Sequence, residues 1–318
     1  MEWETGAFAG LLGRCPAMER LRRDIAQFGP SELRVHVFGE TGTGKEMVAR
    51  ALHDLSPRAR RKLVPVNVAG FTDELLVAEL FGHGRGAFTG AVAAREGYVA
   101  EAEGGTLFID EVGDLSPVAQ VRLLRFLEAG EYQRLGETVA RRADVRVISA
   151  TNVDLQRRVR EGRFREDLWF RLADEVITPP PLRERGADVL LLARHFLRVL
   201  SAGAGAAPPL LSPEVEAALL AHSWPGNVRE LRSAMRRVCV RAAGRPVAVE
   251  DLPRALQQRR PRRWGTLRSA LRERESEVIQ EALERHRGIV ARAAAELGLT
   301  RQGLWLKVRR LGLVVAGP

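Results

Sequence analysis

Short apolar runs alternate with amphipathic stretches through the first half of the chain. These runs predict buried strands at residues 33–38, 63–68, 106–109, 145–149 and 175–177. Residues 47–55, between the first two runs, have the apolar spacing of a helix that ends before a proline. Strands that alternate with helices predict an α/β fold, a parallel sheet wound by helices on both faces.

The pattern changes to helices alone after the Pro179-Pro180-Pro181 run. Helices are expected at residues 189–200, 213–222 and 227–242, with an Ala-, Gly- and Pro-rich loop at residues 201–209. A polar, basic stretch then resembles an interdomain linker. Near the end, apolar spacing predicts helices at residues 271–283, 289–297 and 300–311, the last with Thr300 as its N-cap.

Composition excludes several classes of protein. The chain has 318 residues, 45% of them hydrophobic, so it can bury a core. Its two cysteines, Cys15 and Cys239, cannot form a disulfide framework or a four-thiolate zinc site. It contains no run of 18 apolar residues and no basic-then-apolar export signal at the start. We therefore expect a soluble cytoplasmic protein that does not contact a membrane.

Charge is concentrated at one end of the chain. Residues 259–318 contain 14 basic and 6 acidic side chains, a net charge of +8, whereas the whole chain has a net charge of +10. A nearly neutral body with a basic tail is typical of an enzyme or assembly domain joined to a polyanion binder. On charge alone, a solvated basic face explains the tail equally well.

A glycine-rich loop follows the first predicted strand. It reads Gly39-Glu40-Thr41-Gly42-Thr43-Gly44-Lys45 and leads into a helix, the context of a phosphate-binding loop. Its backbone N–H groups and the helix N-terminus favour phosphates, and Lys45 would reach the β- and γ-phosphates. A flexible surface turn is the alternative. Glu46 stands where Ser or Thr usually holds Mg²⁺, so metal binding must depend on other groups or on water.

Two adjacent acids follow the apolar run at residues 106–109. Asp110 is placed to hold Mg²⁺, directly or through water, and Glu111 to orient or activate the attacking water. Alone, such a pair is as often an ordinary surface feature. Together with the glycine-rich loop it predicts an ATPase that uses ATP and Mg²⁺.

Residues 11–242 resemble the sigma-54-dependent transcriptional activators, the bacterial enhancer-binding proteins of the AAA+ ATPase superfamily. The most specific match is Gly86-Ala87-Phe88-Thr89-Gly90-Ala91, a hexapeptide that marks this family, preceded by family-like residues 79–85. The resemblance implies that Phe88 and Thr89 lie at the tip of an exposed loop that contacts sigma-54. An exposed Phe is costly unless it meets a partner.

Further residues take roles from the same resemblance. Asn67 matches the residue that restrains the catalytic glutamate, and Thr151-Asn152 matches the sensor after the fourth core strand. Arg165 and Arg171 match arginines that reach into a neighbouring subunit's nucleotide, and Arg229 matches the second sensor in the lid. Arginines supplied in trans require an oligomer, so the resemblance implies a ring, a hexamer when active and a dimer when inactive.

The sequence departs from the family at two places. Gly84 stands where an acid is common, and residues 68–71 read Val-Ala-Gly-Phe where Cys-Ala-Ala-Leu is usual. Both places lie beside functional positions, so they affect the expected strength of the contact with the partner.

The C-terminal helices resemble the Fis-type helix-turn-helix module. Leu304, Val308 and Leu311 would pack inward beside Ala293 and Leu297. The residues expected to face DNA are Arg301, Gln302, Trp305, Lys307, Arg309 and Arg310. A plain three-helix packing module is the alternative.

The resemblance implies five segments. These are an N-terminal extension (1–10), an AAA+ α/β subdomain (11–178), a helical lid (179–250), a linker (251–266) and a Fis-type DNA-binding domain (267–318). No receiver domain fits before the ATPase, so we expect regulation by a separate protein in trans, regulation by expression level, or no regulation.

The resulting hypothesis is an activator that binds enhancer DNA and uses ATP hydrolysis in a ring to remodel the closed complex of sigma-54 RNA polymerase holoenzyme. One alternative is a DNA-binding regulator of ordinary promoters with a vestigial ATPase. Another is a replication or repair ATPase, which leaves the hexapeptide unexplained.

Overall fold

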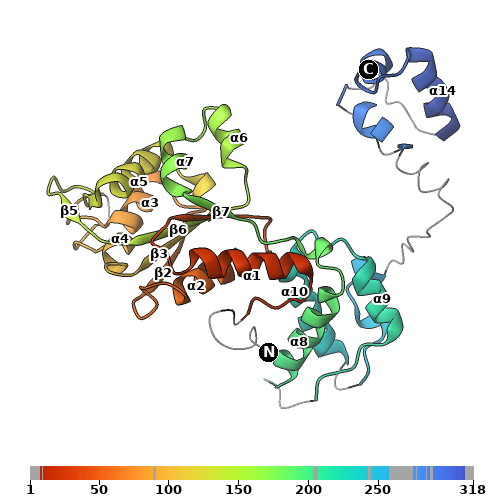
Figure 1. Ribbon diagram of the computed structural model, residues 1–318, viewed down its shortest axis with the longest axis horizontal. Helices are drawn as coiled ribbons and strands as arrows, with labels where there is room; N and C mark the ends of the chain where they lie inside the picture. The colour runs from red at the N-terminus through yellow and green to blue at the C-terminus, as the bar shows by residue number, and fades with distance from the viewer. Residues whose placement is uncertain are drawn as a thin grey trace. The chain divides into compact units, whose positions relative to one another are not determined.

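The computed structural model describes residues 8, 10–88, 91–202, 207–242, 245–257, 275–276, 278–283, 285–286 and 289–311. The chain forms two compact units, residues 1–258 and 259–318, which are described separately. Helix α1 lies at the start of the first unit and α14 in the second (Figure 1).

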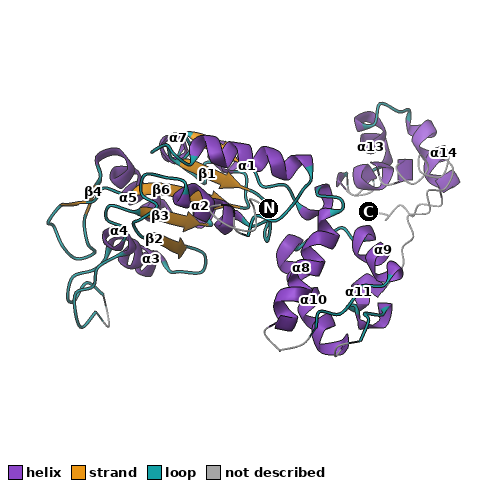
Figure 2. Ribbon diagram, turned by 60° about the horizontal axis from the view of Figure 1, so that its bottom comes forward, coloured by secondary structure: helices purple, strands orange, loops and turns teal. Residues whose placement is uncertain are grey.

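A five-stranded parallel sheet forms the centre of the first unit (Figure 2). Its strands are β1 (Val35–Phe38), β2 (Leu63–Asn67), β3 (Thr106–Asp110), β6 (Arg146–Thr151) and β7 (Glu175–Ile177), in the order β2-β3-β6-β1-β7. The sequence-based prediction of five strands in a parallel α/β sheet is confirmed, with ends shifted by one or two residues. Because all strands are parallel, their carboxyl ends meet at one edge.

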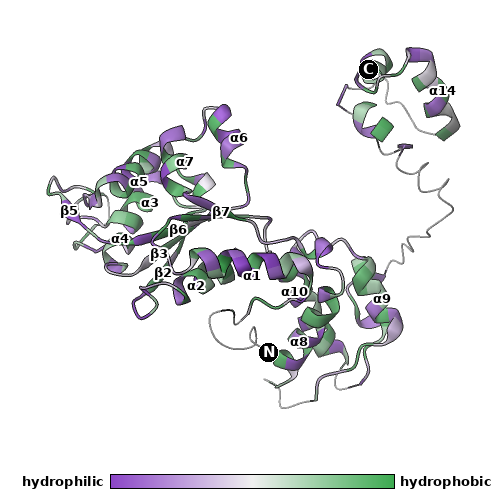
Figure 3. Cartoon of the chain, viewed as in Figure 1, coloured by the Kyte–Doolittle hydropathy of each residue, from purple (hydrophilic) through white to green (hydrophobic). Residues whose placement is uncertain are grey.

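Helices cover both faces of this sheet. Helices α1 (Pro16–Phe28) and α2 (Lys45–Asp54) pack with Val35, Val37 and Ile148 in one core. The opposite core is built from the remaining helices of this subdomain. These are α3 (Asp73–Phe81), α4 (Tyr98–Glu101), α5 (Pro117–Ala129) and α7 (Glu166–Leu172). The subdomain also contains η2 (Val112–Asp114), α6 (Leu155–Arg160) and a hairpin of β4 (Glu131–Tyr132) and β5 (Arg141–Arg142). In Figure 3 the strands are mostly hydrophobic, whereas α1 is striped by hydropathy.

A helical subdomain follows the sheet. It consists of η3 (Leu182–Glu184), α8 (Asp188–Ala202), α9 (Pro213–Ala221), α10 (Asn227–Ala242), η4 (Val249–Asp251) and α11 (Arg254–Gln257). Its core surrounds Trp224, which is fully buried and donates its indole N–H to the carbonyl oxygen of Leu219 at 2.9 Å. The predicted helices are confirmed. However, α8 continues to Ala202, so the predicted loop starts later, because Ser201 is buried and contacts Cys239.

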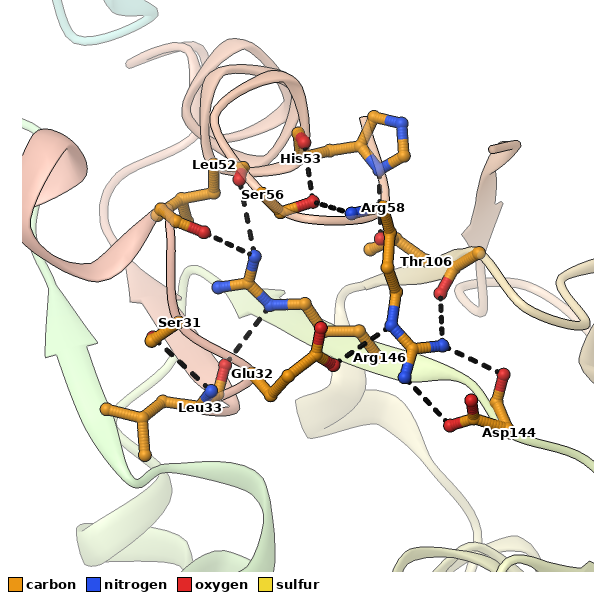
Figure 4. Close-up of polar contacts among 12 residues, drawn as sticks. Ser31, Glu32, Leu33, Leu52, His53, Ser56, Arg58, Thr106, Asp144 and Arg146 are labelled. Carbon is orange, nitrogen blue, oxygen red and sulfur yellow. Dashed lines mark hydrogen bonds and ion pairs between the residues drawn. The ribbon is translucent and has the colours of Figure 1, made fainter. Parts of the chain in front are cut away.

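Two arginines occupy the amino end of the sheet (Figure 4). The buried guanidinium of Arg146 donates to the carbonyl oxygens of Phe28, Gly29, Leu33 and Leu52 at 2.9–3.3 Å. These carbonyls lie at the ends of α1 and α2 and before β1, so one side chain joins three elements. Nearby, Arg58 pairs with Glu32 at 2.9 Å and with Asp144 at 2.8 Å.

The second unit is all-helical where it is described. Residues 275–276, 278–283 and 285 are helical, followed by α13 (Val290–Glu296) and α14 (Arg301–Leu311). Leu304 and Val308 are buried with Ala293, and Leu297 and Leu311 pack against them, as predicted. The hydroxyl of Thr300 accepts from Gly303 N–H at 3.1 Å, which confirms it as the N-cap of α14.

Candidate nucleotide site

The glycine-rich loop, residues 39–44, connects β1 to α2 at the carboxyl edge of the sheet. Gly42 and Gly44 have φ values of +80° and +100°, which favour glycine. A Cβ atom placed on Gly44 would have no heavy atom within 4 Å, so the loop borders open space on this side. The loop and the start of α2 therefore present backbone N–H groups and a helix N-terminus that can accept phosphates.

Lys45, the first residue of α2, is 7% exposed. Its ammonium group lies 3.2 Å from the carbonyl oxygen of Gly39 and 3.6 Å from Glu111 Oε1. The lysine is therefore held at the phosphate loop by one carbonyl and one distant carboxylate. This leaves part of its hydrogen-bonding capacity for a phosphate.

Glu111 has a left-handed backbone with φ +59°, which turns its side chain toward β6. Its Oε2 accepts from the backbone N–H of Asn152 at 3.2 Å and lies 3.5 Å from the Thr151 hydroxyl. The side-chain amide of Asn152 (Nδ2) in turn donates to the Thr41 hydroxyl at 3.0 Å. The structure thus brings the predicted sensor residues, Glu111 and the phosphate loop into one hydrogen-bonded cluster.

Asp110 precedes Glu111 at the end of β3, and its Oδ1 accepts from Glu111 N–H at 3.0 Å. Burial raises the pKa of Asp110; the nearby Lys45 opposes this effect and Glu111 adds to it. A cation beside this carboxylate would relieve its desolvation. No group of three or more metal-ligating side chains exists among the described residues, but Mg²⁺ characteristically needs only one or two carboxylates, phosphates and water, so the residues fit it. Glu46 is exposed and pairs with Arg50.

Asn67 does not make the contact that the resemblance implied. Its Oδ1 accepts from the backbone N–H of Ala69 at 2.9 Å. Asn67 pairs in register with Asp110, but Glu111 is bound by residues of β6 and by Lys45. In this conformation, therefore, the asparagine does not restrain the glutamate, because its side chain is used to close its own turn.

The two arginines expected to act in trans are exposed and bound within their own subdomain. Arg165 pairs with Asp167 at 2.7 Å, and Arg171 lies 3.6 Å from Glu128. These surface pairs are weak and can be exchanged for another anion. Arg229, at the start of α10, is exposed beside the phosphate loop, where a Cβ atom on Gly42 would lie 3.0 Å from its Cβ.

The sequence did not reveal two further contacts of the phosphate loop. The Arg183 guanidinium donates to both carboxylate oxygens of Glu40, at 2.6 and 2.8 Å, and Arg185 donates to the Thr43 carbonyl at 3.0 Å. Hydrogen bonds from Arg183 and Asn227 lower the pKa of Glu40 to about 2. The only sequence signal was two arginines after three prolines, which does not indicate a contact 140 residues away in the chain.

The hexapeptide lies after α3, and its described part is residues 86–88 and Ala91; Thr89 and Gly90 lie outside the described residues. Gly86 N–H donates to Ala91 O at 2.8 Å, which closes the base of the loop. Phe88 was expected to be exposed but is half-buried, because its ring packs edge-on against His83 with centroids 5.0 Å apart. Ala87 packs against Gly136 of the β4–β5 connection.

Beside this loop, the departure at Gly84 has a structural counterpart. A Cβ atom on Gly84 would lie 3.1 Å from Glu137 Cγ. Glu137 is paired with Arg134 and Arg141 at 3.5 and 3.1 Å. A carboxylate from the hairpin thus fills the space beside Gly84.

The expected DNA-facing residues lie on α14. Arg301 and Gln302 are exposed at its start, and Trp305 is 52% exposed. Lys307 was expected to face DNA, but its ammonium group is bonded to Glu275 in the same unit, because the two helices bring these charges together. The side chains of Arg309 and Arg310 lie outside the described residues.

Sequence profiles of known families match nearly the whole chain. The "Sigma-54 interaction domain" matches residues 11–178, the "AAA+ ATPase lid domain" matches residues 183–266, and "Bacterial regulatory protein, Fis family" matches residues 270–311. In addition, no helix among the described residues has the length and apolar character needed to cross a membrane.

Individual proteins are similar over the same extent. The transcriptional regulatory protein ZraR of Escherichia coli is 44% identical over 308 residues, which cover 96% of this chain and 70% of ZraR. The regulator NtrC of Escherichia coli is 42% identical over an alignment of 335 positions, which covers 97% of this chain and 71% of NtrC. The crystal structure of Brucella abortus NtrX in complex with ATP has a TM-score of 0.72 at 35% identity and covers 98% of this chain and 70% of that one.

The sequence profiles and these similarities extend across the phosphate loop, the hexapeptide and the C-terminal helices. The chain belongs to the sigma-54-dependent transcriptional activators, which are AAA+ ATPases with a Fis-type helix-turn-helix.

Proposed function

We propose that this activator works as a ring-shaped motor that binds enhancer DNA, hydrolyses ATP and remodels the closed complex of sigma-54 RNA polymerase holoenzyme in the cytoplasm. The observation that carries the proposal is the cluster at the carboxyl edge of the sheet. There the phosphate loop, Lys45, Glu111 and Asn152 are joined by contacts of 3.0–3.6 Å. Such a cluster couples the presence of a γ-phosphate to both the catalytic glutamate and the sensor.

ATP and Mg²⁺ are the proposed cofactors. Residues 39–46 would hold the phosphates, with Lys45 on the β- and γ-phosphates and Arg229 approaching from the lid. Mg²⁺, held by Asp110 directly or through water, would neutralise charge on the phosphates. Glu111 would orient the attacking water and accept its proton, and Thr151 and Asn152 would keep that carboxylate directed at the site.

Two exposed arginines support the proposed ring of subunits. Arg165 and Arg171 are exposed, and among the described residues their side chains pair with surface carboxylates, so a neighbouring subunit's nucleotide could take them. Arginine supplied in trans raises phosphoryl-transfer rates by about 10³–10⁵-fold in GTPases. We propose that the active assembly is a hexamer and the inactive form a dimer, with Asn67 engaging Glu111 in a different nucleotide state.

The two ends of the mechanism are polymerase and DNA. Residues Gly86 to Ala91 would contact sigma-54, with Phe88 leaving His83 when the loop rises in the ATP state. Arg301, Gln302 and Trp305 would contact DNA, with Lys307, Arg309 and Arg310 on the phosphates. Release of Lys307 from Glu275 is required for its part in this contact.

Substitution Thr89→Ala tests the proposal. We expect transcription from a sigma-54 promoter in a reconstituted assay to be lost, while ATP turnover and DNA binding remain within about twofold, because the role proposed for this residue is contact with sigma-54 and not with nucleotide or DNA. Thr138 is an exposed threonine in the neighbouring connection between β4 and β5. Its substitution Thr138→Ala is the matched control and should leave the rate of transcription unchanged. Full transcription by Thr89→Ala would contradict the assigned role of the hexapeptide.

A further inference from the structure

Four consecutive residues of the phosphate loop are held from behind by the lid. The Glu40 carboxylate accepts from Arg183, at 2.6 and 2.8 Å, and from the Asn227 amide, at 3.1 Å. The three carbonyls that follow also accept from the lid. These bonds are Asn227 Nδ2 to Thr41 O at 3.1 Å, Val228 N to Gly42 O at 3.0 Å, and Arg185 Nη2 to Thr43 O at 3.0 Å.

The direction of these carbonyls fixes the direction of the neighbouring N–H groups. In a trans peptide the C=O of one residue points opposite to the N–H of the next, and the described chain contains no cis peptide. With the Thr41 and Thr43 carbonyls directed at the lid, the N–H groups of Gly42 and Gly44 are directed to the other side. That side is the open one at Gly44, where phosphates would bind.

We propose that Arg183, Arg185 and Asn227 are positioning residues for nucleotide, which orient the phosphate loop by holding its carbonyls and Glu40. This inference rests on the proposed ATP site and adds the parts of the lid on which that site depends. None of the three residues is expected to touch the reacting atoms.

Asn227 is chemically matched to this task. It is fully buried and has a left-handed backbone with φ +51°, which Asn tolerates better than most residues. Its Oδ1 accepts from Leu182 N–H at 2.8 Å, while its Nδ2 donates to Glu40 and to Thr41. One amide thus joins η3, α10 and the phosphate loop, which neither an Asp nor an apolar side chain can do.

Arg185 is a buried cation directly behind the loop. It is 4% exposed, and its guanidinium also donates to the Pro180 carbonyl at 2.9 Å. Within the described part of the chain, no carboxylate forms a salt bridge with Arg185. Burial lowers its pKa, and the nearby Cys15 and Asp188 oppose this effect without reversing it. Its positive charge is therefore neutralised only partly in the protein and favours an anion on the far side of the loop.

Gly42 is required by the same contact. A Cβ atom at this position would lie 2.4 Å from the Gly226 carbonyl oxygen, closer than any side chain can approach. The glycine therefore permits the lid to reach the loop, in addition to supplying its own N–H. By linkage, if the lid contact favours phosphate binding, bound phosphate must favour the lid contact to the same extent.

The experiment measures ADP affinity and ATP kinetics of the full chain carrying Glu40→Gln, Arg183→Gln or both. Glu216→Gln is the matched control, because Glu216 forms a similar exposed pair with Arg194 (2.6 Å) inside the lid, away from the loop. Each single variant should weaken ADP binding and raise KM for ATP by about tenfold, the effect of one charge-assisted bond. In contrast, kcat of Arg183→Gln at saturating ATP should change by less than about threefold, since Glu111 and the residues of the phosphate loop are untouched.

Two features separate positioning from general damage. The double variant should lose no more affinity than either single variant, because both singles remove the same pair. Asn227→Asp should lose more than Arg183→Gln, because it removes both donors and adds a carboxylate beside Glu40. Arg183 is 46% exposed, so Arg183→Gln is expected to fold, as a thermal melt will verify.

The outcomes are distinct. Wild-type chain that binds no nucleotide would overturn the proposed function itself. Wild-type chain that binds ADP while Glu40→Gln, Arg183→Gln and Asn227→Asp bind it equally well would overturn only the positioning role. Additive losses in the double variant, or a fall in kcat with unchanged KM and ADP affinity, would do the same.

Discussion

The two ends of the sheet differ in how many hydrogen-bond and ion-pair partners their positively charged side chains have. At the amino end, Arg146 is bound by four carbonyls, and Arg58 by two carboxylates (Figure 4). At the carboxyl end, Lys45 has one carbonyl at 3.2 Å and one carboxylate at 3.6 Å. The arginines at the amino end have their partners within the protein and therefore stabilise the fold. The lysine at the carboxyl end keeps part of its hydrogen-bonding capacity and can therefore bind a ligand.

The carboxylates follow the same division. Asp144 and Glu32 at the amino end are paired with Arg58, but Asp110 at the carboxyl end has its pKa raised by burial. A raised carboxyl pKa means that the charged form is poorly stabilised by the protein. We therefore expect the amino end of the sheet to contribute to stability and the carboxyl end to bind phosphate and metal.

The largest expected effect is at the carboxyl end. Glu111→Gln should reduce ATP turnover by about 10²–10⁴-fold, because the amide cannot accept the proton of the attacking water. The free energy of unfolding should change by less than about 1 kcal/mol, since the side chain is partly exposed and its weak contacts can be kept. Phosphate release and chemical denaturation measure the two quantities, with substitution of the exposed Glu101, which pairs with Lys62, by Gln as a control.

Turnover unchanged in Glu111→Gln would remove its assigned role. A large loss of stability would instead show that this end of the sheet is structural too, and the comparison between the ends would fail.

The next effect is at the amino end. Arg146→Met should lower the free energy of unfolding by about 3–5 kcal/mol, because the carbonyls at the ends of α1 and α2 lose their buried donor. Arg142→Ala, which removes an exposed arginine paired with Glu131, should cost less than about 1 kcal/mol. Chemical denaturation of both variants measures the difference.

At temperatures where Arg146→Met remains folded, its KM for ATP should match that of the wild type. If the variant is as stable as Arg142→Ala, the buried arginine is not the anchor of this end.

The smallest effect concerns the middle of the sheet. His36 on β1 is buried, bonded to Ser149 at 2.8 Å and packed edge-on against Trp169. Burial, aided by Lys45, lowers its pKa from 6.5 to about 4. Between these values the unfolded chain binds more protons, so the free energy of unfolding should fall as pH falls from 6.5 toward 4, by up to about 1.4 kcal/mol per pH unit.

His36→Leu should remove this share of the pH slope. Part of the slope will remain, because burial also lowers the pKa of His53. Above about pH 8, where His36 is unprotonated in both the folded and the unfolded chain, the slopes of variant and wild type should agree. Identical slopes below pH 6 would show that His36 is not buried as a neutral group.

Sequence reasoning succeeded where local pattern and packing agree. The five strands, α8, α9, α10, α13 and α14 were found from apolar periodicity, and Thr300 from its place before an apolar helix. It missed α1, α3 and α5, which cover the sheet. In α3 one reason is that Leu76, Val77, Ala78, Leu80 and Phe81 are all buried, so the helix has no strongly polar face that reveals its period. This reason does not hold for α1, whose buried Met18, Leu21 and Ile25 recur at helical spacing.

Side-chain direction was the weaker part of the prediction. Lys45, Glu111, Thr151 and Asn152 could be placed together because parallel strands end at one edge. The partners of Asn67, Phe88 and Lys307 were not predicted. Asn67 and Phe88 contact Ala69 and His83, which are near them in the sequence and compete with the expected partners, whereas Lys307 contacts Glu275 of another helix, which only folding brings close.

The sequence by itself determined the order of strands and helices, the phosphate loop and the identity of its lysine and acids, because these depend on local spacing. Only the tertiary structure decided that Arg183, Arg185 and Asn227 hold that loop, and that Arg146 joins three elements at the opposite end. Contacts of this kind join residues more than ninety positions apart, and their energy comes from burial and geometry that exist only after the chain has folded.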